Sequence, residues 1–171
     1  MKLKIAEISD IDRVLKLHYK YQIDSIKDED KKDGFVTTAF TKEQLAKLIT
    51  EENGLFIALD GDEVIAYVMA ASWKFWSDWQ MFAYMIKDLP NLEYLGPRLS
   101  VDNSYQYGPV CVDKSTRWKG VLESIFDWAR EDMSKRYPLQ VTFINKINPR
   151  SYEEHTRKLG LEVIKEFTYN D

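Results

Sequence analysis

Residues 113–120 read DKSTRWKG and place two basic side chains and a glycine in one short turn. Arg117, Lys119 and Gly120 follow an apolar, strand-like run (110–112) and precede apolar residues at helical spacing (121–126). Backbone N–H groups at the beginning of a helix, together with the helix dipole, favour an anion, and glycine lets the backbone approach closely. The turn is therefore a candidate phosphate site. The alternative is an ordinary strand-to-helix connection whose basic side chains are solvated.

The segment NPRSYEEHTRKLG (148–160) contains the side chains best suited to proton transfer. The imidazole of His155 has an ordinary pKa of about 6.5, so it can donate a proton or polarise a water near neutral pH. Tyr152, about one helical turn earlier, is a second candidate donor. The alternative interpretation places His155 on an exposed helix face beside Glu154 and Arg157.

Other residues with chemical potential have simpler interpretations. Cys111 is the only cysteine, which excludes an intramolecular disulfide and a cysteine-based zinc cluster, and we expect a small buried side chain there and no metal. His18 lies beside an apolar helical stripe, which favours a structural role. The carboxylates of Asp113 and Glu123 fit a solvated position as well as that of a general base.

Apolar periodicity predicts the elements that position these residues. Strands are expected at 3–8, 55–59, 63–72, 104–113, 139–145 and 161–169, and helices at 9–26, 41–53, 73–87, 121–135 and 148–160. The pairs Ser9/Asp12 and Thr41/Gln44 have the spacing of capping boxes, and Asp60-Gly61 is typical of a hairpin turn. The charged run 27–34 is a predicted loop.

The order of these elements indicates a mixed α/β sheet, mostly antiparallel, with helices on its faces. A hairpin must pair antiparallel, whereas the strand–helix–strand unit 105–145 favours a right-handed parallel crossover. Ligands in open sheets favour the carboxyl ends of strands where the winding changes. The predicted site is therefore at the end of the strand that contains Cys111, beside the basic turn.

Composition limits the class of protein. The chain has 171 residues, of which 44% are hydrophobic and 30% charged, which predicts one folded domain over 1–171. The net charge of −4 argues against a nucleic-acid partner. No run approaches the roughly 20 apolar residues of a membrane span, and no secretory signal is recognisable, so we expect a cytoplasmic protein without a membrane partner.

Residues 112–126, VDKSTRWKGVLESIF, resemble the acetyl-CoA pyrophosphate motif of the GNAT superfamily of N-acetyltransferases. The core of that motif is Arg/Gln-x-x-Gly-x-Gly/Ala after a valine-rich strand, and Arg117 and Gly120 match it. Leu122 replaces the usual small third residue, and Trp118 stands where a glycine is common. These departures tighten the space around the phosphates but leave the backbone donors in place.

A second GNAT-like segment follows the next predicted strand. The family pattern is Asn-x-x-Ala-x-x-Phe-Tyr-x-x-Leu-Gly-Phe, and this chain supplies Asn148, Ser151 for the small residue, and Leu-Gly-Leu at 159–161. The spacing from the asparagine to the glycine is one residue longer than in the family. Counted from Asn148, the proton-donating tyrosine of the family falls on His155; counted back from the glycine, it falls on Thr156.

The resemblance implies a GNAT-like fold over nearly the whole chain, with splayed parallel strands at 105–112 and 139–145. It implies acetyl-CoA as co-substrate and direct attack of an amine on the thioester, with His155 or Tyr152 as catalytic residue. The backbone of 110–112 would hold the pantetheine arm as an added strand would. The cofactor-binding residues so implied are Val110, Cys111, Val112, Arg117, Trp118, Lys119, Gly120, Val121, Leu122, Asn148 and Ser151.

The acceptor is specified least. The resemblance places its pocket at 34–40 and at the aromatic block 73–82, where four side chains suit a wall for an aromatic or aliphatic amine, a buried helix or a dimer patch: Trp73, Phe75, Trp76 and Trp79. Tyr105 and Tyr107 alternate on one face of their strand, which suits core packing or acceptor contact. A small-molecule amine is the expected partner, and the protein is expected to be a monomer or homodimer.

Two alternatives to an active transferase remain open. The tyrosine missing from the second segment suits a GNAT-like module that binds CoA without chemistry. A protein-interaction domain that binds no CoA is the other.

Overall fold

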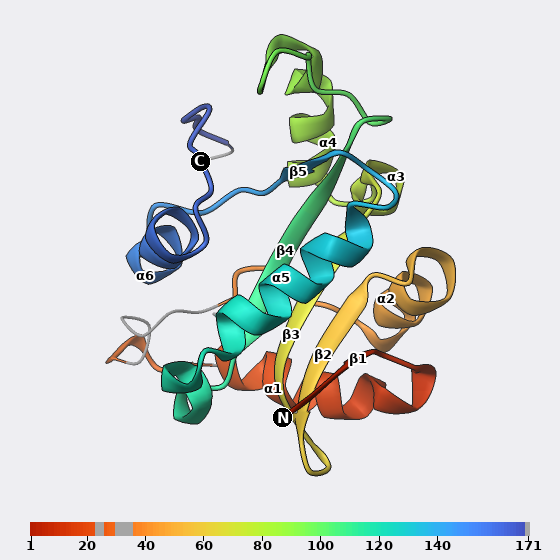
Figure 1. Ribbon diagram of the computed structural model, residues 1–171, viewed down its shortest axis with the longest axis vertical. Coiled ribbons are helices and arrows are strands. Elements are labelled where there is room, and N and C mark those ends of the chain that lie inside the picture. Colours follow the sequence, from red (N-terminus) through yellow and green to blue (C-terminus); the bar gives the residue numbers. More distant parts are fainter. Residues whose placement is uncertain (23–25, 30–35, 170–171) are drawn as a thin grey trace.

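The computed structural model of the chain describes residues 1–22, 26–29 and 36–169, which form a five-stranded sheet (Figure 1). The strands follow one another across the sheet in chain order: β1 (Lys2–Ile5), β2 (Leu55–Asp60), β3 (Glu63–Ala71), β4 (Ser104–Val112) and β5 (Leu139–Val141). The first three pairs are antiparallel, and β4–β5 is parallel. The predicted mixed sheet with one parallel pair is confirmed.

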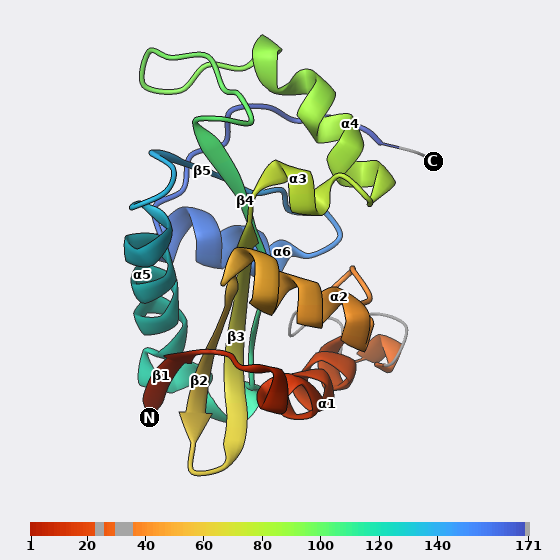
Figure 2. The ribbon, with the colours of Figure 1, turned by 90° about the vertical axis from the view of Figure 1, so that its right-hand side faces the viewer.

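Helices cover both faces of this sheet, as the edge-on view of Figure 2 shows. One face carries α5 (Val121–Met133). The other carries α1 (Ile11–Tyr21), α2 (Lys42–Lys47), α3 (Trp73–Trp76) and α4 (Gln80–Asp88). A short helix, α6 (Pro149–Glu153), follows β5 and continues as a π-helical turn, Glu154–Lys158. In the described part of the chain, no helix combines the length and apolarity needed to cross a lipid bilayer.

The central strand β3 shows why the sequence folds into these layers. Eight consecutive residues, 64–71, are buried, because helices cover both faces of the sheet. Tyr67 and Met69 pack into the apolar cluster beneath α1–α4, while Val68 and Ala70 pack into the cluster beneath α5. An uninterrupted apolar strand thus serves two cores at once.

Several local predictions are confirmed by the backbone. The Thr41 hydroxyl accepts a hydrogen bond from the Gln44 N–H at 3.2 Å, and the Gln44 side chain accepts from the Thr41 N–H at 2.9 Å, so this capping box is present. Asn53, with a φ of 48°, ends the helical segment that follows. Gly61 has a φ of 61° in the hairpin turn between β2 and β3.

The capping box predicted at Ser9 and Asp12 is wrong. Glu7 and Asp10 form it instead, with the Glu7 N–H donating to the Asp10 carboxylate at 2.8 Å. Asp10 is fully buried and pairs with Lys4 at 3.0 Å as well as with Arg13. Because these charged partners hold the Asp10 carboxylate, the capping box lies two residues before the predicted position at Asp12.

Three predicted strands are shortened or absent. The strand expected at 3–8 ends at Ile5, because Ile8–Asp10 already forms a 3-10 helical turn. Only Leu139–Val141 of the strand expected at 139–145 is formed, because the next residue, Thr142, donates a side-chain hydrogen bond to the Tyr107 carbonyl at 2.6 Å. The strand expected at 161–169 does not form, since the three residues of β5 offer little edge for a partner. Phe167 instead stacks on Tyr84 of α4, with ring centroids 5.7 Å apart.

The helix predicted at 73–87 is two helices. Its chain turns at 77–79, where the Trp79 N–H donates to the Trp76 carbonyl at 3.0 Å, and then restarts as α4. The aromatic spacing continues across this turn, which is why the sequence pattern did not mark it. Helix α1 ends at Tyr21 rather than near residue 26, and most of the loop predicted at 27–34 lies outside the described residues.

Candidate functional site

The parallel strands β4 and β5 form a fork. They pair at three positions only, from Ser104 with Leu139 to Gln106 with Val141. Beyond Gln106, Gly108 adopts a φ of 109°, a backbone conformation that favours glycine, and the two strands separate. Two pockets lie in this fork, at the carboxyl end of β4.

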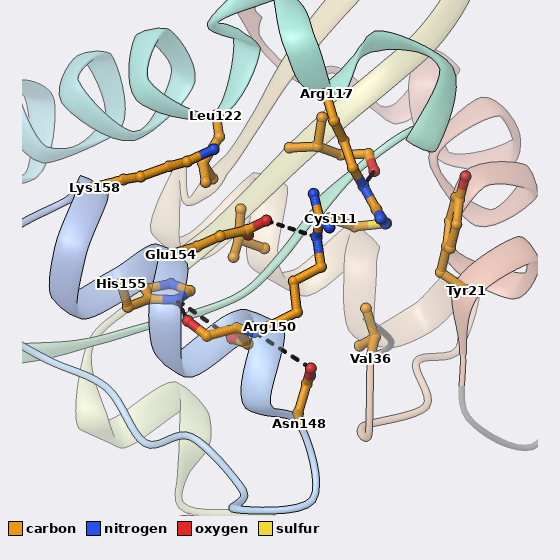
Figure 3. A pocket seen from close by; sticks show the side chains of 13 residues that line it. Tyr21, Val36, Cys111, Arg117, Leu122, Asn148, Arg150, Glu154, His155 and Lys158 are labelled. Atoms are coloured by element: carbon orange, nitrogen blue, oxygen red, sulfur yellow. Dashed lines mark hydrogen bonds and ion pairs between the residues drawn. The ribbon is translucent and has the colours of Figure 1, made fainter. Parts of the chain in front are cut away.

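The first pocket, which we call the basic pocket, is bordered by the end of β4, by the turn that contains Arg117 and by the start of α5 (Figure 3). Arg117 extends into it from the turn, while Arg150, Glu154 and Lys158 line it from α6 and its continuation. Three cations against one carboxylate leave an excess of positive charge among the described lining residues. The others are Tyr21, Val36, Val110, Cys111, Val112, Leu122, Asn148, Ser151 and His155.

The turn that contains Arg117 is held by the end of α1. The Arg117 Nε donates to the Val112 carbonyl at 3.2 Å, and its guanidinium lies 5.5 Å from the centre of the Tyr21 ring. The Tyr21 hydroxyl accepts from the Lys114 N–H at 2.8 Å. Burial of Asp113 opposes its ionisation, but hydrogen bonds from Ser115 and Lys20 outweigh this and lower its pKa. The anchored carboxylate therefore remains charged and fixes the start of the turn.

The second wall of the basic pocket is one face of α6. Asn148 caps this helix, because its side chain accepts from the Ser151 N–H at 3.4 Å. Arg150 and Glu154 are one turn apart and form an ion pair at 2.9 Å, and Lys158 follows after another turn. Their spacing of four residues places all three side chains on the same side as the pocket.

His155 is buried, with an exposed fraction of 3%, and both of its ring nitrogens have partners. Nδ1 lies 2.7 Å from the Ser151 carbonyl, which can only accept, so Nδ1 must carry the proton. Nε2 is then the acceptor for the Tyr107 hydroxyl at 3.2 Å. Burial lowers the pKa of His155, whereas burial raises the pKa of Tyr107 well above 10. At neutral pH the pair is therefore an uncharged imidazole that holds a protonated phenol.

The second pocket, which we call the neutral pocket, lies where the two strands have parted. Its described lining residues include no Asp, Glu, Lys or Arg, and the low pKa of His155 keeps that ring neutral too. They are Val36, Thr37, Thr38, Phe82, Gln106, Tyr107, Gly108, Pro109, Val110, Thr142, Phe143, Ile144, Asn145, Asn148, Ser151 and His155. Five residues line both pockets: Val36, Val110, Asn148, Ser151 and His155.

Three other candidate residues do not line these pockets. Val121, the first residue of α5, is buried in the core, and Gly120 is not among the lining residues; the side chains of Trp118 and Lys119 are outside the described part. Tyr152 is 46% exposed and lines neither pocket.

The aromatic block belongs mainly to the core. Trp73, Phe75 and Trp76 are buried in the cluster beneath α1–α4, and Trp79 packs against that cluster. Instead, Phe82 of this block lines the neutral pocket.

Cys111 has the properties of an inert thiol. It is 5% exposed, and burial raises its pKa to about 12. Among residues 1–22, 26–29 and 36–169, no group of three or more His, Cys, Asp or Glu side chains is arranged to hold a metal ion.

No family model matches the sequence, and neither does any curated protein. Solved structures do match. A mutant of the BH1408 protein of Bacillus halodurans superposes with a TM-score of 0.66 at 14% identity, covering 100% of this chain and 99% of the other. The aminoglycoside N-acetyltransferase AAC(6')-Iy, in complex with the bisubstrate analogue CoA-S-monomethyl-acetylneamine, gives 0.63 at 14% identity, covering 99% and 96%.

A third match is the aminoglycoside 6'-N-acetyltransferase AAC(6')-IG of Acinetobacter haemolyticus, with a TM-score of 0.60 at 15% identity, covering 100% and 97% of the two chains. At identities this low, the TM-scores show a shared fold alone. The chain has the fold of these N-acetyltransferases, which is the fold that the resemblance to the GNAT superfamily implied.

Proposed function

We propose that this protein is an acetyl-CoA-dependent N-acetyltransferase that acts on a small amine. The observation that supports the proposal is that a basic pocket and an uncharged pocket meet in the β4–β5 fork. One has an excess of positive charge, the other has uncharged described walls, and five residues line both. Such an arrangement suits a polyanionic co-substrate on one side and an uncharged acceptor on the other, with their reacting groups at the junction.

The basic pocket fits the diphosphate and pantetheine of acetyl-CoA. Arg117, Arg150 and Lys158 supply positive charge, and α5 begins beside the same turn, after Gly120 with a φ of 71°. The ladder between β4 and β5 ends at Gln106, so the later residues of β4 border the fork on the β5 side, while β3 pairs with them on the other side. Residues 110–112 can therefore receive an extended pantetheine arm as an added strand.

Acetyl-CoA would supply a thioester whose carbonyl carbon accepts the amine. The amine nitrogen attacks that carbon, the C–N bond forms as the C–S bond breaks, and the sulfur leaves with the bonding electron pair. We assign to Nε2 of His155 the proton that the amine loses, relayed by Tyr107, which lines the neutral pocket: the Tyr107 hydroxyl gives its own proton to the unprotonated Nε2 as it takes the proton from the amine. His155 then returns the proton to the sulfur.

Acetyl-CoA binding and thiol release test the proposal together. Saturating acetyl-CoA, at 100 times its dissociation constant, should add about 2.7 kcal/mol to the free energy of unfolding and raise Tm. A panel of small amines should then release CoA thiol from acetyl-CoA. An unchanged Tm would refute the proposal and leave the protein-interaction domain. A raised Tm without thiol release for any amine would instead identify a module that binds CoA without chemistry.

A further inference from the structure

The side chain of Gln106 is held in one orientation at the point where the fork opens. Its Nε2 donates to the Tyr107 carbonyl at 2.7 Å, and its exposed fraction is 1%. The reverse orientation would set two oxygen acceptors against each other, so the positions of oxygen and nitrogen follow from the contact. The Trp76 indole also donates to the backbone carbonyl of Gln106 at 3.3 Å, which fixes the strand there.

The Oε1 atom of Gln106 is a buried acceptor without a donor among the described residues. Buried amide oxygens are nearly always hydrogen-bonded, because an unpaired one loses its water without compensation. Gln106 lines the neutral pocket, so a ligand in that pocket can supply the missing donor. Gly108 keeps space beside the amide: a Cβ there would lie 3.3 Å from Thr142 Oγ1 and 3.7 Å from Gln106 Nε2.

The walls around this oxygen select against charge. Phe82, Phe143 and Pro109 present apolar surface, and Thr38 presents only a hydroxyl. An ammonium group that leaves water for such surroundings loses hydration without gaining a counter-ion, so its neutral amine form is favoured. The neutral form is the one that attacks a thioester. A second ammonium on the same molecule would carry the same penalty with no benefit to the reaction.

We propose that Gln106 Oε1 accepts a hydrogen bond from the N–H of the acceptor amine, and that the acceptor is a monoamine with an uncharged alkyl or aryl body rather than a polyamine or aminosugar. This assignment rests on the proposed acetyl transfer and names the substrate class of the same site. Two probes of equal length separate the classes. Pentylamine ends in a methyl group where 1,4-diaminobutane carries a second ammonium group.

The first experiment compares kcat/KM for these two amines in the thiol-release assay with the full chain. We expect pentylamine to be preferred by at least about 100-fold, because the effective cost of burying an unpaired charge is large. Titration calorimetry in the presence of CoA should give the same order of affinities without chemistry. Equal values, or a preference for the diamine, would overturn the assignment of the acceptor class.

The second experiment replaces Gln106. Gln106→Met keeps the shape, and the Tyr107 carbonyl retains the hydrogen bond from Thr142. We expect KM for pentylamine to rise roughly 2–10-fold, the usual value of one neutral hydrogen bond, with KM for acetyl-CoA unchanged. Gln80→Met, on the exposed surface of α4, is the matched control and should change neither constant. An unchanged KM for pentylamine in Gln106→Met would refute the contact.

A third variant keeps the test decisive if Gln106→Met fails to fold. Thr38 is only half-buried, so Thr38→Asp should fold and bring a carboxylate to the pocket wall, with Thr38→Asn as its uncharged control. The preference for pentylamine should fall at least about tenfold in Thr38→Asp alone. An unchanged preference would refute selection by uncharged walls. If CoA does not raise Tm, the proposed function fails and this inference fails with it; if acetyl transfer occurs with the wrong amine class, only the inference fails.

Discussion

His18 should make the stability of this fold depend on pH. The ring lies on α1 with no exposed surface, its Nδ1 is 2.8 Å from the Tyr67 hydroxyl, and it packs edge-on against Phe40 at 5.5 Å between ring centroids. Burial lowers the pKa of His18 from 6.5 to about 4. The folded chain therefore binds this proton much less readily than the unfolded chain.

The sign and the magnitude follow from proton linkage. The contribution of His18 is fully present above pH 6.5 and is lost as the pH falls toward the folded pKa of about 4, because the unfolded chain takes up the proton first. Between pH 7 and pH 5 this single group should lower the free energy of unfolding by about 2 kcal/mol. His155, whose pKa burial also lowers, adds to the decline in the same direction.

Urea unfolding at pH 7 and pH 5 measures this difference. The chain has two histidines, so His18→Phe removes one of the two contributions and leaves that of His155. The variant leaves the Tyr67 hydroxyl without its partner and should be less stable at pH 7, but its decline between pH 7 and pH 5 should be smaller than that of the wild type by about 2 kcal/mol, so the difference in stability should narrow by that amount at pH 5. Equal declines in both proteins would show that His18 takes up its proton in the folded state, and would refute the reasoning.

Two further predictions concern the proposed reaction. His155→Phe should preserve CoA affinity, lower kcat by roughly 10²–10⁴-fold, and abolish a decline in rate that the wild type shows only below pH 6.5, because burial lowers the pKa of this ring. Steady-state kinetics across pH tests this, and a loss of rate in Tyr152→Phe alone would contradict the register count that selects His155. Gly120→Asp should weaken CoA binding at least about tenfold, since aspartate there is strained at a φ of 71° and repels phosphate, whereas Arg117→Ala should weaken it less. A Cβ at Gly120 meets only the Glu123 carboxylate, at 3.7 Å, so crowding is not the cause; equal calorimetric affinities of wild type and Gly120→Asp would remove the turn from the site.

Much of the fold was predictable because its signals are local. The capping box at Thr41, the hairpin turn at Gly61 and the apolar run of β3 each depend on neighbouring residues. A signal for the wall formed by Arg150, Glu154 and Lys158 was present but was not used, since these residues recur every four positions, which indicates one face of a helix. The spacing does not indicate that this face borders the basic pocket, which only the structure shows.

The rest depends on contacts between distant segments. No spacing indicates that Tyr21 at the end of α1 contacts the turn at Arg117, or that Gln106 lies with one amide oxygen unpaired. The strand expected at 161–169 does not form, because its formation also depends on a partner from another segment of the chain. Its alternation is typical of a strand, but a strand also needs an edge, and the short β5 does not provide one.

The burial of Cys111 has a practical consequence for following the proposed chemistry. With its pKa raised by burial to about 12, this thiol is ionised at pH 7.5 roughly a thousandfold less than an ordinary cysteine, and only the thiolate reacts with a disulfide reagent. Because Cys111 is the sole cysteine, such a reagent added to the folded protein should give almost no background colour. In a continuous assay, an absorbance rise that requires both amine and acetyl-CoA would then report free CoA, whereas a slow rise in a control with protein and reagent alone would report exposure of Cys111 by unfolding of the chain.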